Sequence, residues 1–331
     1  MADASALWFP SRETAAIMSA SVPPVTEGWC EIRTLFSAVS PGTERLVYRA
    51  QVPTTLAQDM RCPYMEGDFT FPVKYGYSLV GRVSAGPASL RGRLVHVLHP
   101  HQDRCVVRCD DVYPLPPDVP PRRATLASNL ETAVNVLWDA QVCLGERVLV
   151  VGFGVVGALV ARLLQEIPGV QLTVVDTAPA KQRLATAMGL HAVPVEELEP
   201  VFDLAIHASA SSAGLQVALD HVGFEGRVVE LSWYGTRPVT VQLGGTFHNQ
   251  RKRIISSQVA TISPAQRPRW DTQRRKALVF DLLRRPAFDA CLTHTVPFAD
   301  LPRVFEQLAG PQSESLAYLV AYAQEGEENN V

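Results

Sequence analysis

The chain has 331 residues, of which 47% are hydrophobic and 19% charged, as expected for a globular protein long enough for two domains. Its net charge of −3 argues against a general attraction to nucleic acid or to an anionic membrane. No apolar run approaches the ~20 residues that span a bilayer, and the N-terminus lacks the basic start and apolar core of a signal peptide. We therefore expect a cytoplasmic protein, and we expect its six cysteines, none in a CxxC pair, to be reduced.

The first part of the chain is predicted to be rich in β-strands. Residues 1–118 contain short alternating runs separated by proline and glycine, a pattern typical of a small barrel or sandwich. One of these runs, FPVKYGYSLVG (71–81), predicts a half-buried strand that carries Tyr75 and Tyr77. The proline-rich segment PLPPDVPPRR (114–123) predicts a linker of restricted backbone to the next part.

After this linker, helices and strands alternate. RATLASNLETAVNVLWDA (123–140) has the apolar spacing of a helix. Continuous apolar runs predict strands buried on both faces, with helices between them. These strands are RVLVVGFG (147–154), VQLTVVD (170–176), FDLAIHAS (202–209) and GRVVELSWYG (226–235). RIISSQVA (253–260) is predicted to be a further strand near a sheet edge. The order predicts an α/β fold with a doubly wound parallel sheet. The acidic tail AQEGEENNV (323–331) is predicted to be disordered.

A glycine-rich motif joins the first of these strands to its helix. Gly152, Gly154 and Gly157 form a GxGxxG pattern, and Asp176 closes the next strand. Gly152 permits the tight turn, Gly154 lets the backbone approach a pyrophosphate, and Gly157 allows helix and strand to pack closely. Asp176 would accept hydrogen bonds from the ribose hydroxyls and repel a 2′-phosphate. The motif therefore predicts a dinucleotide site that favours NAD(H) over NADP(H).

Further cofactor contacts are expected at the helix start and at the strand ends. The free amides and positive dipole of a helix N-terminus suit a pyrophosphate, and loops after parallel strands reach the cofactor crevice. The residues concerned are Val155, Val156, Ser209, Ser232 and Trp233. Lys181 and Arg183, just downstream of Asp176, keep NADP(H) open as an alternative.

Several segments resemble the medium-chain dehydrogenase/reductase family. They are SAVSPGTERLVYRA (37–50), KYGYSLVGRV (74–83), LASNLETAVNVLW (126–138), GRVVELSWYG (226–235) and LTHTVPFADLPRVFEQLAG (292–310). The resemblance implies a GroES-like catalytic domain of residues 1–118 and 290–331, a Rossmann domain of residues 119–289, and a homodimer through the edge of the Rossmann sheet. The segment SAVSPGTERL (37–46) is most similar to the branch of the family that contains the hydroxyethyl bacteriochlorophyllide dehydrogenases.

The resemblance also implies where a catalytic zinc would be bound, and the residues there do not suit it. The three positions fall at Ser40 or Pro41, at Tyr77 and at Ser128. Zinc in such sites is held by thiolate, imidazole or carboxylate groups. The four-cysteine segment that binds the family's structural zinc is also missing. We therefore predict a zinc-independent member.

Three histidines and an aspartate offer an alternative metal site. His96, His99, His101 and Asp103 cluster in the sequence and could form a mononuclear site. Their spacing matches no known zinc signature, and they lie where the family has no catalytic metal. We interpret them as surface or turn histidines.

Without zinc, hydroxyl and carboxyl groups must handle the proton that accompanies hydride transfer. Tyr77 occupies the position of a metal-binding histidine, Thr43 matches the family's hydroxyl relay residue, and Glu44 matches an adjacent acid. Glu131 is a further candidate acid, and Thr132 matches a residue that lines the nicotinamide pocket.

Each of these residues also has a structural interpretation. Tyr77 could only fill the space left by the metal and hydrogen-bond Ser128, whereas in its catalytic role its pKa could be lowered by Lys74. Glu44 could pair with Arg45 or with a backbone amide. Glu131 could brace a helix, and Tyr75 is interpreted as packing.

Three functions compete at this point. The first is an NAD(H)-dependent dehydrogenase or ketoreductase that acts on a secondary alcohol or ketone, with a small molecule as its partner. The second is reduction of a conjugated C=C bond, as in the enone and quinone reductases of the same superfamily. The third is a non-catalytic dinucleotide-binding protein.

Overall fold

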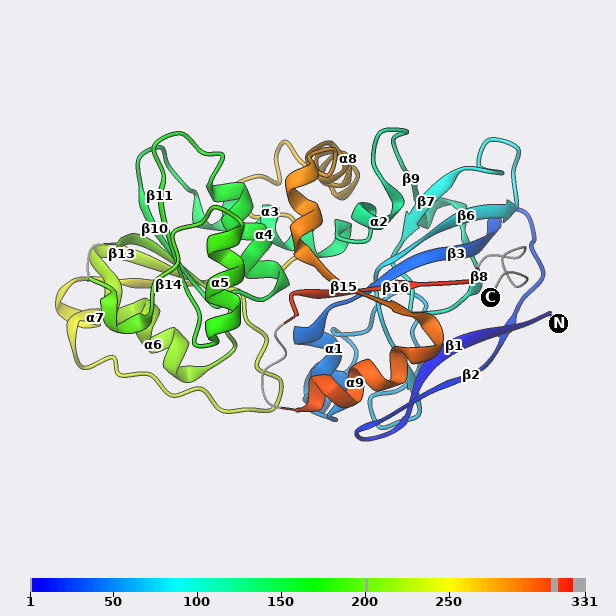
Figure 1. Cartoon of the computed structure of the whole chain (residues 1–331), viewed down its shortest axis with the longest axis horizontal. Helices are drawn as coiled ribbons and strands as arrows, with labels where there is room; N and C mark the ends of the chain where they lie inside the picture. The colour runs from blue at the N-terminus through cyan, green and yellow to red at the C-terminus, as the bar shows by residue number, and fades with distance from the viewer. Residues whose placement is uncertain (1, 200–201, 311–314, 324–331) are drawn as a thin grey trace. The chain divides into compact units, whose positions relative to one another are not determined.

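The computed structural model describes residues 2–199, 202–310 and 315–323 (Figure 1). The acidic tail predicted to be disordered lies, from residue 324 on, outside the described residues. The chain divides into two compact units, Met1–Ser128 with Phe280–Val331, and Asn129–Val279. We call them the β-rich unit and the Rossmann unit. The predicted domain boundaries lie about ten residues from these limits, and the assignment of a function to each unit stays a prediction.

The β-rich unit is built on two sheets. One contains seven strands in the order β15-β16-β3-β6-β7-β9, with β8 paired to β3. The other has the order β2-β1-β5-β4. The strands of the first sheet are β3 (Trp29–Val39), β6 (Leu79–Ala85), β7 (Leu94–Val97), β8 (Arg104–Arg108), β9 (Val112–Pro114), β15 (Leu292–Pro297) and β16 (Ala317–Ala321). Those of the second are β1 (Ala2–Ser11), β2 (Thr14–Val22), β4 (Glu66–Gly67) and β5 (Val73–Lys74).

The strand predicted over residues 71–81 is interrupted, which corrects that prediction. The segment Tyr75–Ser78 lies between β5 and β6 and belongs to neither strand. Gly76 has φ +144°, and a Cβ added there would lie 3.1 Å from the ring of His101. A residue with a side chain would be strained and crowded at this position. The chain therefore turns at Gly76, and Tyr77 leaves the strand.

Three helices in the described residues accompany these sheets; α1 was not expected, and α2 begins inside the segment predicted to be a linker. SPGTERLVY forms α1 (Pro41–Tyr48), with proline at the first helical position, where its missing N–H costs no hydrogen bond. The other two are α2 (Pro121–Ala124) and α9 (Leu301–Ala309). α9 buries Val304, Phe305 and Leu308 along one stripe, as helical spacing predicts.

The Rossmann unit contains a five-stranded parallel sheet, as predicted. Its order is β11-β10-β12-β13-β14, and every neighbouring pair is parallel. The strands are β10 (Arg147–Val151), β11 (Gln171–Val175), β12 (Phe202–His207), β13 (Val222–Glu230) and β14 (Arg253–Ser256). The central strands are almost wholly buried, which explains their continuous apolar sequences. The predicted edge strand within residues 253–260 is confirmed as β14.

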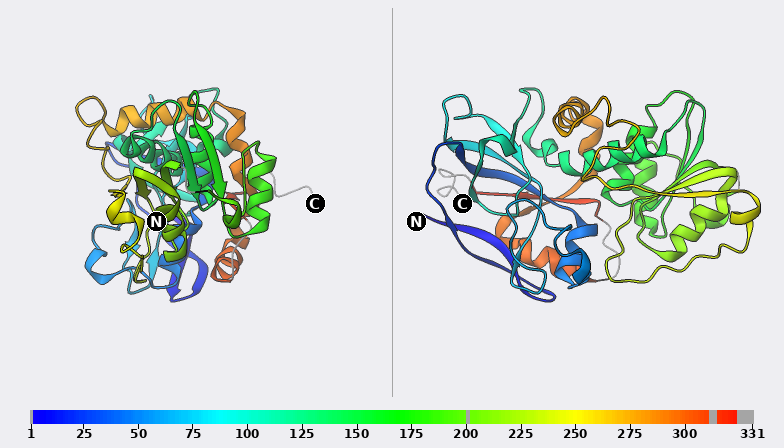
Figure 2. Two further views of the ribbon diagram at one scale, coloured as in Figure 1. Left: turned by 90° about the vertical axis from the view of Figure 1, so that its left-hand side faces the viewer. Right: turned by 180° about the vertical axis from the view of Figure 1, so that it is seen from behind.

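Four helices in the described ranges connect successive strands of this sheet (Figure 2). They are α4 (Val155–Leu164), α5 (Pro179–Ala187), α6 (Ser212–His221) and α7 (Thr246–Asn249). α3 (Ala127–Ala140) precedes β10, and α8 (Thr272–Leu282) follows β14. Short 3-10 turns also occur in the chain at Thr54–Leu56, Cys109–Asp111, Val195–Glu197, Pro286–Cys291 and Phe298–Asp300. Because α4 leads outward to β11 and α6 leads from β12 to β13, the right-handed crossover rule places them on opposite faces.

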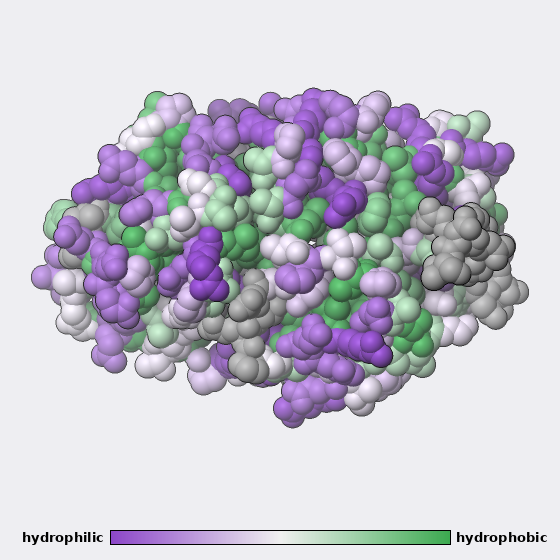
Figure 3. All heavy atoms as spheres, viewed as in Figure 1, coloured by the Kyte–Doolittle hydropathy of each residue, from purple (hydrophilic) through white to green (hydrophobic). Residues whose placement is uncertain are grey.

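Hydrophilic and apolar side chains are interspersed on the face shown in Figure 3. Large apolar side chains that are exposed include Leu144, Phe224 and Ile254. None of the helices in the described ranges combines the length and the apolar character that a bilayer crossing requires.

Candidate functional site

The glycine turn of the Rossmann unit lies between the end of β10 and the start of α4. A Cβ added at Gly152, whose φ is +100°, would lie 2.7 Å from the backbone nitrogen of Ser209. One added at Gly157 would lie 2.1 Å from the carbonyl oxygen of Gly152. By contrast, no described atom lies within 4 Å of a Cβ built on Gly154. Two glycines thus allow the turn to pack closely, and the third leaves open space at the helix start.

Asp176 is held beside this turn by two backbone amides. One carboxylate oxygen accepts a hydrogen bond from the amide of Phe153 at 2.7 Å, and the other from the amide of Ala178 at 2.9 Å. Each oxygen retains a further lone pair that could accept a ribose hydroxyl. Asp176 can therefore hold the backbone of the turn and still bind the ribose hydroxyls.

The start of α4 offers hydrogen-bond donors next to the open space at Gly154. Val155 and Val156 occupy the first turn of the helix, where backbone amides have no intrahelical acceptor. Together with the positive end of the helix dipole, these amides suit the pyrophosphate of a dinucleotide. The turn, Asp176 and this helix end form a set of residues that fits such a cofactor.

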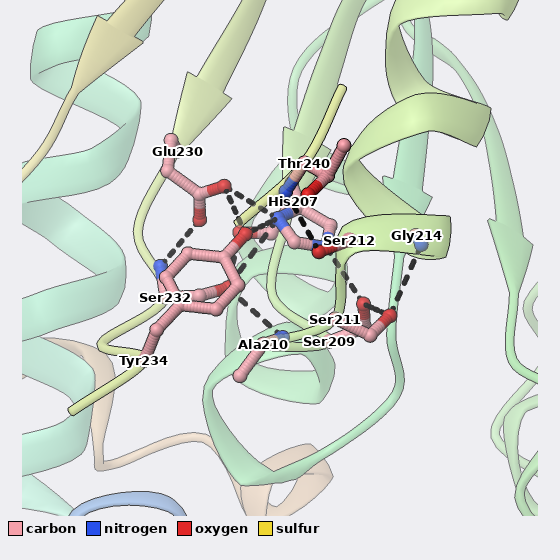
Figure 4. A network of polar contacts seen from close by, with 10 residues as sticks. All are labelled: His207, Ser209, Ala210, Ser211, Ser212, Gly214, Glu230, Ser232, Tyr234 and Thr240. Carbon is pink, nitrogen blue, oxygen red and sulfur yellow. Dashed lines mark hydrogen bonds and ion pairs between the residues drawn. The ribbon is translucent and has the colours of Figure 1, made fainter. Parts of the chain in front are cut away.

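Two of the residues predicted at the strand ends, Ser209 and Ser232, belong to one polar network (Figure 4). Ser209 follows β12, and its hydroxyl lies 2.6 Å from the Nε2 atom of His207. Ser232 follows β13, and its hydroxyl accepts a hydrogen bond from the amide of Ala210 at 3.1 Å. Trp233, the next residue, is half-buried.

The centre of this network, His207 with Glu230, was not predicted from the sequence, and neither was the hydrogen bond of Tyr234 to Glu230. A signal was available, because His207 and Glu230 each follow a buried apolar run at the end of a strand, residues 204–206 in β12 and 228–229 in β13. Buried charged or titratable groups need partners, so two such groups at neighbouring strand ends indicate a contact.

In the β-rich unit, the Tyr77 hydroxyl contacts the side chains of Ser40 and Thr43. Burial raises the pKa of Tyr77, and the nearby charge of Glu44 raises it further, so the hydroxyl stays protonated at neutral pH. The structure thus brings together three of the predicted site residues with Ser40.

Two predictions about Tyr77 are wrong. Lys74 does not lower its pKa: the Lys74 ammonium donates hydrogen bonds to Gln102, at 2.7 Å, and to Glu66. Ser128 does not bind the Tyr77 hydroxyl, because its own hydroxyl donates to the Tyr77 carbonyl oxygen at 2.8 Å. Ser128 therefore holds the backbone at this position and leaves the Tyr77 hydroxyl to other partners.

Glu44 is fully buried and has partners on both carboxylate oxygens. One oxygen accepts the amide of Ser40 at 2.7 Å, and the other lies 2.9 Å from the Nε2 atom of His101. His101 in turn contacts the hydroxyl of Ser37 at 2.7 Å, which lies 2.9 Å from that of Tyr322. The predicted pairing with a backbone amide is confirmed, and the histidine partner was unexpected.

The interpretation of the histidine cluster as surface or turn residues is wrong. His96 and His101 are fully buried, and His99 is 4% exposed. Burial lowers the pKa of His99 to about 3, so its ring is neutral. Within the described part of the chain, no three His, Cys, Asp or Glu side chains are grouped so that they could hold a metal ion.

Glu131 and Thr132 lie on α3 in the Rossmann unit. The buried Glu131 carboxylate forms ion pairs with Arg275, at 3.3 Å, and with Lys276, both on α8. This is the bracing arrangement that was the structural alternative for Glu131. The roles of Glu131 in catalysis and of Thr132 beside the nicotinamide stay predictions.

Several proteins of known structure have the same fold. One is an alcohol dehydrogenase from Escherichia coli CFT073 complexed with NADH (TM-score 0.77, 16% identity, 97% of this chain and 100% of that one). Another is L-idonate 5-dehydrogenase from Escherichia coli K-12 (0.77, 13%, 97% and 98%). A third is 2R,3R-butanediol dehydrogenase from Bacillus subtilis (0.76, 15%, 96% and 99%). The fold is that of the alcohol dehydrogenases.

Sequence similarity to characterised proteins is weaker than structural similarity. L-galactonate-5-dehydrogenase from Escherichia coli K12 is 27% identical over 206 residues, which cover 58% of this chain. The match spans 57% of that enzyme, little more than half of its length. No protein-family model matches the chain.

Proposed function

We propose that this chain is a medium-chain dehydrogenase/reductase that transfers a hydride between NAD(H) and a secondary alcohol or ketone without zinc. The observation that carries the proposal is the glycine turn with Asp176 fixed beside it. Gly154 leaves open space where a pyrophosphate would approach, and Asp176 keeps lone pairs for the ribose hydroxyls. A carboxylate at this position favours NAD(H), and NADP(H) is the less favoured alternative.

Tyr77 and its neighbours are proposed to interact with the substrate oxygen, which gains or loses a proton during hydride transfer. Because the pKa of Tyr77 is raised, its hydroxyl is protonated at neutral pH and acts as a hydrogen-bond donor rather than as a phenolate base. A donor suits reduction of a ketone, whose oxygen gains a proton as its carbon gains the hydride. Bound nicotinamide supplies that hydride. Thr43 and Ser40 orient the hydroxyl, and the Glu44 carboxylate holds the amide of Ser40.

Zinc independence is supported by the chemistry of the side chains at the three family positions. Ser40, Tyr77 and Ser128 present hydroxyl groups, which are poor ligands for zinc in proteins. The Ser40 and Ser128 groups also have protein partners, the first Tyr77 itself and the second the Tyr77 carbonyl. Tyr77, oriented by these partners, is therefore proposed to hold the substrate oxygen by a hydrogen bond.

The substrate class rests on the similar enzymes as well as on the site. Those named above are dehydrogenases of galactonate, idonate and butanediol, which supports an alcohol group as the reacting function.

Reduction of a conjugated C=C bond is the second candidate. A protonated Tyr77 could hydrogen-bond the carbonyl oxygen of an enone while the hydride adds to the β-carbon, and this step needs no metal. The same feature, the raised pKa of Tyr77, supports both candidates, and the product separates them.

The test is consumption of NADH by the full chain with matched saturated ketones and α,β-unsaturated ketones, followed by product analysis. Secondary alcohol as product supports the first candidate, and saturated ketone supports the second. NADH binding without turnover on both sets would instead favour a non-catalytic dinucleotide-binding protein.

A further inference from the structure

His207 is a fully buried histidine at the end of β12 with a close partner on each ring nitrogen (Figure 4). Its Nδ1 atom lies 2.7 Å from a carboxylate oxygen of Glu230, which ends β13. Its Nε2 atom lies 2.6 Å from the hydroxyl oxygen of Ser209. An acid, an imidazole and a hydroxyl thus stand in line at the carboxyl end of the parallel sheet.

The hydrogen-bond partners of Glu230 fix the direction of this line. The carboxylate also accepts hydrogen bonds from the amide of Ser232 at 2.7 Å and from the hydroxyl of Tyr234 at 2.8 Å. Burial alone would raise the pKa of Glu230, but these contacts and His207 lower it overall, so the group is ionised at neutral pH. An ionised carboxylate only accepts, and Nδ1 of His207 must donate to it. In a neutral ring Nε2 is then the acceptor, and Ser209 donates to it.

The far end of the line is set by the first turn of α6. The amide of Gly214 donates to the hydroxyl oxygen of Ser211 at 3.0 Å, and this oxygen lies 3.0 Å from that of Ser209. Since the Ser209 proton is directed to His207, Ser211 donates to Ser209. The Ser209 oxygen therefore has its proton on a base and one lone pair unused, and Ser209 is an exposed residue.

The backbone around Ser209 supports this placement. The residue lies in the turn between β12 and α6, and the next residue, Ala210, has φ +50°, a conformation that is strained for a residue with a side chain. A Cβ added at Gly214 would lie 2.1 Å from the Ser209 oxygen and 2.8 Å from Nε2 of His207. Only glycine allows α6 to approach so closely. A hydroxyl on a tight strand-to-helix turn, with a base oriented by an acid, is the signature of an activated nucleophile.

We propose that Ser209, with His207 as its base and Glu230 as the group that orients the base, is a nucleophile toward small activated carboxylic esters. This activity is separate from hydride transfer. The Ser209 oxygen bonds to the ester carbonyl carbon while its proton passes to Nε2 of His207. The bond from that carbon to the alcohol oxygen then breaks, and the alcohol takes the proton from His207. Water cleaves the acyl-Ser209 ester by the same steps, releases the carboxylic acid and restores the hydroxyl.

The experiment is labelling of the full-length chain with a fluorophosphonate, read by intact mass and by mapping of the modified residue. Wild type is expected to gain one adduct, on Ser209, with loss of fluoride. Ser209→Ala is expected to gain none. Ser211→Ala is the matched control, a neighbouring hydroxyl of the same network, and should still be labelled.

A base variant separates an activated serine from one that is merely exposed. His207→Gln is expected to slow labelling by roughly 10²-fold or more, the usual contribution of a general base. Thermal unfolding shows whether each variant is folded. If His207→Gln fails to fold, Ser209→Ala, a substitution at an exposed position, still tests the proposal. Absence of an adduct in wild type, an adduct that persists in Ser209→Ala, or an unchanged rate in folded His207→Gln would overturn the proposal.

Discussion

At the scale of single residues, burial sets the protonation states of Tyr77 and His99 in the β-rich unit. The Tyr77 hydroxyl is kept protonated because its anion would lose hydration and face the charge of Glu44. His99 is kept neutral for the same reason, with its ring stacked on Tyr64 and its Nδ1 atom 2.8 Å from the carbonyl of Pro100. These opposite shifts have separate measurable consequences.

The first prediction concerns Tyr77→Phe. The substitution removes the hydroxyl and keeps the ring, so we expect kcat for ketone reduction to fall by about 10²–10⁴-fold, the range for loss of a general acid. NADH affinity should stay unchanged, because the substitution leaves the glycine turn and Asp176 intact. Steady-state kinetics and a fluorescence titration of NADH measure the two quantities. An unchanged kcat would show that Tyr77 only fills space.

The second prediction concerns pH and His99. The pKa of this histidine falls from 6.5 to about 3 on folding, so below pH 6.5 the unfolded chain binds a proton that the native chain refuses. Stability contributed by the neutral ring is therefore lost as the pH falls from 6.5 toward 3, at up to about 1.4 kcal/mol per pH unit. His99→Asn should reduce this slope by up to one proton in urea unfolding measured across that range. A slope equal to that of wild type would contradict the buried neutral histidine.

At the scale of elements, two glycines of the turn from β10 into α4 have different roles. Gly157 lies where the helix meets the carbonyl of Gly152, so its role is packing. Gly154, with φ −80°, adopts a backbone conformation open to any residue and faces open space. The motif thus contains both a structural and a ligand-facing position, which substitution to alanine can separate.

The third prediction is this pair of variants. Gly157→Ala should destabilise the fold by about 1–3 kcal/mol or more, because its Cβ meets backbone that cannot yield easily. Gly154→Ala should unfold at nearly the wild-type temperature and yet bind NADH at least roughly 10-fold more weakly, since the added methyl occupies the approach of the pyrophosphate. Calorimetry and NADH titration report the two effects. Equal NADH affinity in Gly154→Ala and wild type would argue against a cofactor at this turn.

At the scale of the whole molecule, β14 is an edge strand of the Rossmann sheet, and its outer side pairs with no other strand of the described residues. Ile254 on this strand is 40% exposed. An edge of this kind can pair with a second copy of the chain. We therefore predict a homodimer through this edge. The cytoplasmic location also stays a prediction.

The fourth prediction follows from that edge. Ile254→Lys should convert the dimer to a monomer, because a charge would be buried where the two edges meet. Leu144→Lys, at another exposed apolar residue of the same unit, serves as the control and should leave the dimer intact. Light scattering after size-exclusion chromatography measures the mass. A monomeric wild type would contradict the prediction at once.

The fifth prediction concerns metal. Purified protein should contain zinc well below one equivalent, and treatment with a chelator should leave NADH turnover unchanged, because hydroxyl groups occupy the family's ligand positions. Elemental analysis and activity before and after chelation test this. Stoichiometric zinc, or activity that chelation abolishes and zinc restores, would contradict it.

The amino-acid sequence by itself determined the parallel sheet, the glycine turn and the edge strand. Their signals are local: continuous apolar runs, a fixed glycine spacing and an acid at a strand end. It also placed Tyr77 beside Thr43 and Glu44 through family resemblance. The further hydrogen-bond partners of these residues come from segments far apart in the chain, and local patterns do not predict them.

Only the tertiary structure decided those contacts. Glu44 meets His101, and His207 meets Glu230 and Ser209, through side chains brought together by strand pairing and turns. A histidine also looks the same in the sequence whether it is exposed or buried, and burial sets its charge. The surface interpretation of His96, His99 and His101 therefore failed, and the line from Glu230 to Ser209 was not foreseen.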